Sequence, residues 1–177
     1  LLASSAASDV YKRQLLIQQS IQQLNLASEH VERLRQEMNA LASTLPEYST
    51  VMGIYGVGKT YGPQLIAEIG DVSRFTHREA LTAFAGVDPG VDESGQHKSK
   101  SNRASKVGSA RLRKTLFQIM TTLLQNAPED DPVYRFLDKK RAQGKPYYVY
   151  MTAGANKFLR IYYGKVKECL RNLEQAE

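Results

Sequence analysis

The feature that most constrains the fold is a recurrence of apolar residues, at steps of mostly three and four, between residues 15 and 45. Glutamine, glutamate and arginine fill the positions between them, and Pro46 ends the run. This spacing places the apolar side chains along one side of a helix over residues 15–46, as in a coiled coil. Such a helix either self-associates or folds back on its own domain. Its apolar positions are Ile17, Ile21, Leu24, Val31, Leu34, Met38, Leu41 and Leu45.

The rest of the chain also predicts helices, so we expect an all-α fold: a long N-terminal coiled-coil-like helix followed by a compact helical domain over residues 47–173. Glycine or proline residues end most of the helical stretches. Residues 87–108 are polar and lack periodicity, which indicates a long polar loop. The expected helices cover roughly 60–69, 78–84, 112–124, 132–143 and 148–173.

The first residues, 1–14, do not resemble the start of a natural protein. The chain begins at Leu1 rather than at methionine, and residues 4–14 resemble translated sequencing-adapter read-through. A signal peptide would need a basic start followed by an apolar core, and this stretch has neither. We therefore interpret residues 1–14 as a non-native leader, and the chain as a fragment truncated at its N-terminus.

The positive charge of the chain favours an acidic partner. The formal net charge is +6 and the pI is about 9.4. Residues 94–128 contain no Asp or Glu, whereas an ordinary surface mixes charges of both signs. This favours nucleic acid over a membrane as the partner, because no basic amphipathic helix with an aromatic side is present. The cations of this stretch are Lys98, Lys100, Arg103, Lys106, Arg111, Arg113 and Lys114.

The remaining composition excludes several classes of protein. One cysteine, Cys169, cannot form an intramolecular disulfide or a cysteine-based zinc site, and it fits a reducing cytosol. The three histidines lack metal-ligand spacing, and no apolar run is long enough to span a bilayer. We therefore expect a cytoplasmic protein with no metal site in this chain and no membrane partner.

A glycine-rich turn allows two interpretations. Residues 53–60 match the P-loop pattern GxxxxGK[ST], in which Lys59 would contact nucleotide phosphates and Thr60 would contact magnesium. A P-loop follows a buried parallel strand, however, and the segment 48–52 is short and polar at its start, unlike such a strand. A P-loop NTPase fragment is therefore the less favoured hypothesis.

The same turn fits a helix-hairpin-helix near residues 50–70 better, while a plain helical turn is the non-functional alternative. Gly56 and Gly58 flank Val57, and glycines permit backbone conformations and close approaches that other residues do not. Backbone N–H groups at the start of the second helix would bind a DNA phosphate without reading the base sequence. Lys59 adds positive charge there.

A series of motifs in order resembles one known family. The turn at residues 56–58 is followed by the segments 65–71, 83–89, 93–95, 105–108 and 111–114. Their order and spacing are similar to the transposase domain of the insertion-sequence-110 family, also described as the 116/110/902 group. The resemblance covers about residues 50–165, and the preceding helix matches the coiled-coil region of that family.

The resemblance implies a DNA transposase that attacks a phosphodiester with a serine and retains the strand as a phosphoserine. The nucleophile falls on Ser94, beside the flexible Gly95, and Ser105 is its rival. A serine hydroxyl needs activation, and nearby cations would neutralise the phosphate. The DNA-binding residues would be Gly56, Gly58, Lys59, Thr60, Lys98, Lys100, Arg103, Lys106, Arg111, Arg113 and Lys114.

The resemblance also implies parts that this chain lacks. Members of the family carry a RuvC-like acidic domain before the coiled coil, in which Mg²⁺ is expected, so we expect the isolated chain to be inactive and to need no cofactor. A homo-oligomer formed through the N-terminal helix is expected, and a guide RNA is a further candidate partner. The alternative function is a non-catalytic helix-hairpin-helix DNA-binding module in which Ser94 is only a loop residue.

Overall fold

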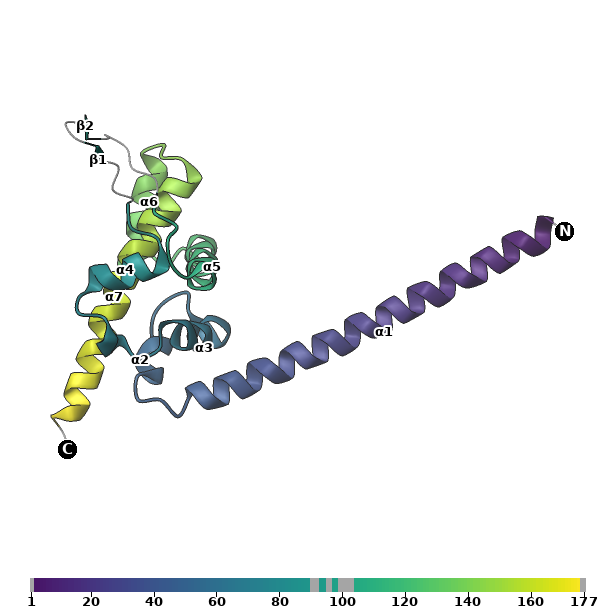
Figure 1. Cartoon of the computed structure of the whole chain (residues 1–177), viewed down its shortest axis with the longest axis horizontal. Coiled ribbons are helices and arrows are strands. Elements are labelled where there is room, and N and C mark those ends of the chain that lie inside the picture. The colour runs from purple at the N-terminus through teal and green to yellow at the C-terminus, as the bar shows by residue number, and fades with distance from the viewer. Residues whose placement is uncertain (1, 90–92, 95–96, 99–103, 176–177) are drawn as a thin grey trace. The chain divides into compact units, whose positions relative to one another are not determined.

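The computed structural model describes residues 2–89, 93–94, 97–98 and 104–175 of the chain (Figure 1). The chain divides into two compact units, Leu1–Ala40 and Leu41–Glu177. Helices account for nearly all regular structure in the described residues. The all-α fold class predicted from the sequence is therefore confirmed.

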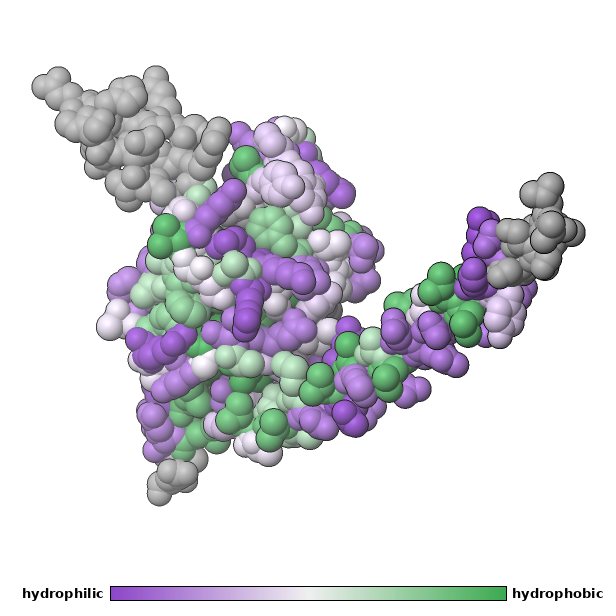
Figure 2. All heavy atoms as spheres, turned by 45° about the vertical axis from the view of Figure 1, so that its right-hand side comes forward, coloured by the Kyte–Doolittle hydropathy of each residue, from purple (hydrophilic) through white to green (hydrophobic). Residues whose placement is uncertain are grey.

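The first unit is formed by the helix α1, Leu2–Ala42, whose last two residues belong to the second unit. The predicted long helix is confirmed, but it begins well before Leu15, because residues 2–14 contain no glycine or proline that would break it. The side chains of residues 9–38 are exposed, apolar ones included. Figure 2 shows hydrophobic patches between hydrophilic ones along this helix. Pairing of α1 with a second helix remains a prediction.

The first half of the second unit consists of short helices whose ends have local causes. Gly70 ends α3 with a φ of 63°, and Gly86 ends α4 in the left-handed conformation with a φ of 64°. The side chain of His77 caps α4, because its Nδ1 accepts a hydrogen bond from Ala80 N at 3.1 Å. These elements are α2 (Tyr48–Met52), α3 (Gly58–Ile69), the 3₁₀ helix η1 (Val72–Arg74) and α4 (Arg78–Ala85).

The second half holds three longer helices that begin at polar caps or at proline. Ser109 Oγ accepts a hydrogen bond from Leu112 N at 3.1 Å, and Asp131 Oδ1 accepts bonds from the first N–H groups of the next helix. The helix bounds expected between residues 60 and 173 differ from the observed ones by no more than two residues. The helices are α5 (Ala110–Asn126), α6 (Pro132–Ala142) and α7 (Tyr147–Glu174).

The core of the second unit forms around α7, which packs against α2, η1, α4, α5 and α6. Burial of apolar side chains on this helix is the main driving force for the arrangement. One polar contact adds to it: the buried Tyr163 hydroxyl donates to the carbonyl of Phe75 at 3.0 Å. The largest fully buried side chains of α7 are Met151, Phe158 and Tyr162.

The described parts of the polar segment between α4 and α5 contain regular structure that the sequence did not predict. Pro89 and Ala104 form an antiparallel bridge, and two short strands, β1 (Glu93–Ser94) and β2 (His97–Lys98), pair with each other. The expected loop therefore includes a small hairpin. Strands this short carry no period-2 pattern, which explains why the sequence did not indicate them.

Glycine in the middle of α7 permits a close contact with side chains of α5 and α6. A Cβ atom at Gly154 would lie 2.9 Å from Leu137 Cγ on α6 and 3.0 Å from Met120 Sδ on α5. Both distances are shorter than normal van der Waals contact, so a side chain here would force the side chains of Leu137 and Met120, or the helices that carry them, to shift. Gly164, on the same helix, has open space around the equivalent position.

This difference predicts the behaviour of two matched substitutions. We expect Gly154→Val to lower the free energy of unfolding by about 1–3 kcal/mol, because the added methyl groups overpack the contact of α7 with α5 and α6. Gly164→Val should change it by less than about 0.5 kcal/mol. Urea unfolding followed by circular dichroism measures both values. Equal effects of the two substitutions would contradict the close approach at Gly154.

Candidate nucleic-acid interface

The loop between α4 and α5 is closed at its base by backbone hydrogen bonds. Ser105 N donates to Asp88 O at 2.9 Å, and Lys106 N donates to Gly86 O at 3.2 Å. Ser109 N donates to Phe84 O at 2.7 Å, which ties the start of α5 to the end of α4. Both ends of the loop are thus held on the helical core.

Two residues at the base of this loop have unusual backbone conformations. Lys106 has a φ of 52°, a left-handed conformation that residues other than glycine seldom adopt. Gly108 has a φ of 129°, and a Cβ atom there would collide with the carbonyl of Phe84. Such backbone conformations persist only where the surroundings enforce them, and they are common at functional sites.

The two candidate serines differ in position. Ser94 lies in β1 and pairs with His97 of β2, but its side chain is outside the described residues. Ser105 lies at the base of the loop, and its hydroxyl donates to Asp88 Oδ1 at 2.6 Å. Of the predicted basic residues, Lys98 is described only as part of β2, while Lys100 and Arg103 are outside the described residues.

A cleft of about 1180 Å³ opens beside this base. It is bounded by the loop ends at Pro89 and Ala104, the first half of α5, Phe136 of α6 and the N-terminal half of α7. Its described lining includes no aspartate or glutamate. The cations that line it are Lys106, Arg113, Lys114, Lys157 and Arg160.

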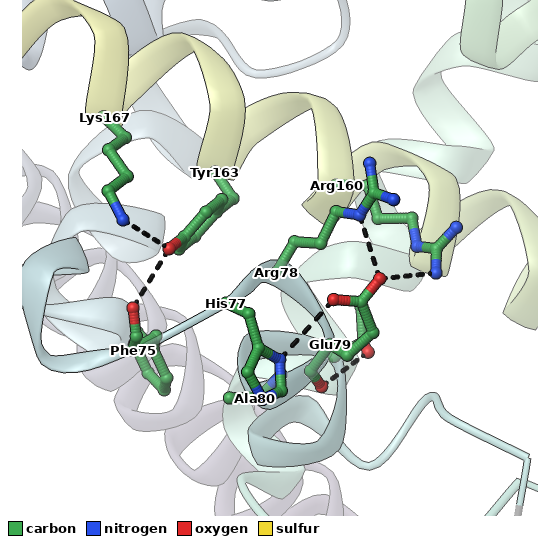
Figure 3. A network of polar contacts seen from close by, with 9 residues as sticks. Phe75, His77, Arg78, Glu79, Ala80, Arg160, Tyr163 and Lys167 are labelled. Carbon is green, nitrogen blue, oxygen red and sulfur yellow. Dashed lines mark hydrogen bonds and ion pairs between the residues drawn. The ribbon is translucent and has the colours of Figure 1, made fainter.

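Several of these cations have partners that orient them. Arg113 Nη1 donates to Ala85 O at 3.0 Å. Arg160 Nη2 lies 2.9 Å from Glu79 Oε1, which also pairs with Arg78, as Figure 3 shows. The hydrogen bond from Arg78, with the nearby positive charge of Arg160, lowers the pKa of Glu79 below its ordinary value. Glu79 is therefore ionised at neutral pH and neutralises part of the charge around Arg160.

The cleft combines residues that the sequence predicted with others that it missed. Lys106, Arg113 and Lys114 were predicted and line the cleft together, whereas Arg111 is exposed and is not part of the lining. The cations and aromatics of α6 and α7 were missed. A signal for them existed, because residues 139–167 contain no Asp or Glu, as residues 94–128 do not. The missed lining residues with charge or a ring are Phe117, Phe136, Tyr148, Lys157 and Arg160.

The glycine turn joins α2 to α3. Gly56 has a φ of 81°, and a Cβ atom there would lie 3.0 Å from Leu123 Cγ, so this glycine lets the turn pack on α5. Gly58 begins α3 with a φ of 56° and open space around it, and no side chain caps the helix. Lys59 and Thr60 are exposed.

The segment before the turn argues against a P-loop. Residues 48–52 form the helix α2, whereas a P-loop requires a buried parallel strand at this position. The P-loop hypothesis therefore lacks its structural context.

The described residues contain no group of three or more His, Cys, Asp or Glu side chains that could hold a metal ion. No helix in the described part of the chain is both long and apolar enough to cross a membrane.

Comparison with known proteins identifies the domain that contains the turn and the loop. Residues 48–135 match the family described as Transposase IS116/IS110/IS902 family. Two curated relatives, both named pilin gene-inverting protein, come from Moraxella bovis and Moraxella lacunata; each is 26% identical over 145 residues, which cover 80% of this chain and 44% of the relative. The chain thus spans less than half the length of these relatives. Through the domain at residues 48–135, the chain belongs to the IS116/IS110/IS902 family of transposases.

Proposed function

We propose that this chain binds DNA and supplies the serine for strand cleavage and rejoining in the transposition of an insertion sequence. The observation that carries the proposal is the basic cleft beside the loop that contains Ser94. Five cations and no carboxylate among its described lining suit the phosphate backbone of a nucleic acid. The name of the relatives, pilin gene-inverting protein, also supports a rearrangement of DNA.

Ser94 is the proposed nucleophile, and Ser105 is the rival. In the proposed step the serine Oγ attacks phosphorus, a sugar hydroxyl leaves, and the phosphoserine keeps the bond energy for rejoining. Ser105 contacts a carboxylate, as an activated nucleophile would, through its hydrogen bond to Asp88. We favour Ser94 because the Ser105–Asp88 pair already has a structural role, closing the loop through backbone and side chain together.

The turn between α2 and α3 is the proposed helix-hairpin-helix. Two helices joined by a glycine turn agree with that motif. The N-terminus of α3 is uncapped by side chains and carries the exposed Lys59, so its backbone N–H groups are suited to hold one DNA phosphate. This contact would position the duplex without reading its sequence.

Further components of the reaction are proposed besides the cleft and the turn. The described carboxylates do not form a metal-binding group, so Mg²⁺ is assigned to the acidic domain that the family resemblance implies. The isolated chain is accordingly expected not to cleave DNA. A homo-oligomer formed through α1 and a guide RNA complete the proposed assembly. The alternative, a non-catalytic DNA-binding module, rests on the same turn without the serine chemistry.

The first prediction from the proposed function concerns duplex binding. We expect log affinity for duplex DNA to fall linearly with log salt, by about 0.9 for each phosphate contacted. Lys59→Ala should reduce that slope by about 0.9, because one phosphate contact is lost. Lys12→Ala, an exposed lysine of the first unit, is the control and should leave the slope unchanged. Fluorescence anisotropy over a salt series measures the slopes.

Magnesium-ATP serves as the second ligand in the same titration. ATP binding that disappears in Lys59→Ala, together with no affinity for duplex DNA, would restore the P-loop hypothesis and reject the proposal. Duplex binding that does not depend on salt would also contradict it, because the cleft and the turn would then not contact phosphates.

The second prediction separates the two serines in the full-length transposase. We expect Ser94→Ala to abolish the covalent protein–DNA adduct, because the nucleophilic oxygen is removed. Ser105→Ala should keep the adduct and lower the free energy of unfolding by about 0.5–1.5 kcal/mol through loss of the hydrogen bond to Asp88. Denaturing gel electrophoresis with labelled DNA detects the adduct. An adduct retained in both variants would favour the non-catalytic alternative.

The third prediction concerns α1. Ile17, Leu24, Val31 and Met38 recur every seven residues and are exposed, as in one seam of a coiled coil. Replacing Leu24 and Val31 together by Gln should therefore shift the chain from oligomer to monomer. The control replaces Gln22 and Glu29 by Ala. These two residues lie outside the seam and, like Leu24 and Val31, are seven residues apart. Sedimentation velocity measures the mass, and a wild-type chain that is monomeric at all concentrations would refute the assignment.

A further inference from the structure

Three tyrosine rings cluster at the start of α7, and two of them, Tyr147 and Tyr148, are exposed. The rings of Tyr147 and Tyr148 meet edge to face with centroids 5.2 Å apart, and Tyr147 also meets Tyr150 at 5.5 Å. Tyr148 is 74% exposed and lines the cleft. Tyr150 is half-buried against the core, whereas Tyr147 and Tyr148 are exposed, and exposed neighbouring aromatic side chains are typical of binding surfaces.

Cations and aromatic rings both line the same cleft. Lys157 Nζ lies 4.9 Å from the ring centroid of Phe136, and both residues line the cleft. Tyr148 and Phe117 add rings to the lining, beside the cations of α5 and α7. Base-stacking rings combined with a positively charged groove are the two components of single-strand binding surfaces.

The exposed ring of Tyr148 favours an unpaired strand over a duplex. Bases inside a duplex hide their faces in the stack, so an aromatic side chain can stack only on a base that has left it. The volume of about 1180 Å³ exceeds the roughly 300–1,000 Å³ of small-molecule pockets, which suits an extended ligand. The cations match its phosphates.

We propose that this cleft binds a short unpaired segment of polynucleotide, with bases stacked on Tyr148 and phosphates neutralised by Lys106, Arg113, Lys114 and Lys157. The inference rests on the proposed function and adds to it a site for a strand separated from its complement. Pro89, Ala104 and Lys106, at the two ends of the loop that carries Ser94, line the cleft, so this site lies at the base of that loop.

The test compares three labelled probes by fluorescence anisotropy: oligo-dT of about ten nucleotides, oligo-U of the same length and a blunt duplex. Tyr148→Ala should weaken single-strand binding about tenfold, because one base loses its stacking partner. Tyr148→Phe keeps the ring and should stay within about twofold of the wild type. Tyr11→Ala, an exposed tyrosine of the first unit, is the matched control and should have no effect.

The outcomes separate this inference from the proposed function. Duplex affinity that is unchanged in Tyr148→Ala, with single-strand affinity lost, supports the site, and the stronger of oligo-dT and oligo-U identifies a DNA or an RNA strand. Duplex binding without single-strand binding overturns the inference and leaves the proposed function standing. Binding of neither probe rejects both.

Two further results would also overturn the inference. Equal loss of duplex and single-strand affinity in Tyr148→Ala would make the aromatic cluster part of the duplex surface. Competition by poly-glutamate as strong as by unlabelled oligo-dT would make the cleft a site for an acidic protein segment, because such a competitor has charge but no bases to stack.

Discussion

The packing of α7 on its neighbours is the constraint on which the second unit depends. One side of this helix buries its large apolar residues against α2, α4, α5 and α6, and Gly154 lets α5 and α6 approach it closely. The walls of the cleft belong to α5, α6 and α7 and to the loop ends. The geometry of the cleft therefore follows from the geometry of the core, and a change in helix spacing would alter the separation of its cations.

Electrostatic repulsion among the cations that line the cleft destabilises the folded domain. Five positive side chains line one cleft, and each repels the others. Their partners orient them and neutralise little of the charge: a backbone carbonyl for Arg113 and an aromatic ring for Lys157. Glu79 is a carboxylate partner, held ionised beside Arg160. The remaining positive potential attracts a polyanion from solution, an attraction that salt weakens.

Much of this fold could be predicted from the sequence, because glycine, proline and capping residues mark the helix ends. The long helix, the helix bounds and the family followed from periodicity and from ordered motifs. Only part of the cleft lining was predicted from the sequence. Lys106, Arg113 and Lys114 belong to one acid-free stretch, whereas Lys157 and Arg160 come from a helix far along the chain. The sequence alone does not indicate that these cations share one cleft, because only the packing of α7 on α5 brings the two groups together.

The closed base of the loop has a consequence for how this domain can change. Pro89 and Ala104 are bridged, and the hydrogen bonds at Asp88 and Gly86 fix both ends on the core whatever lies between them. Lengthening a loop whose ends are already fixed adds little entropic cost, since that cost grows only with the logarithm of its length. An insertion between these two anchors should therefore cost the helical scaffold little stability.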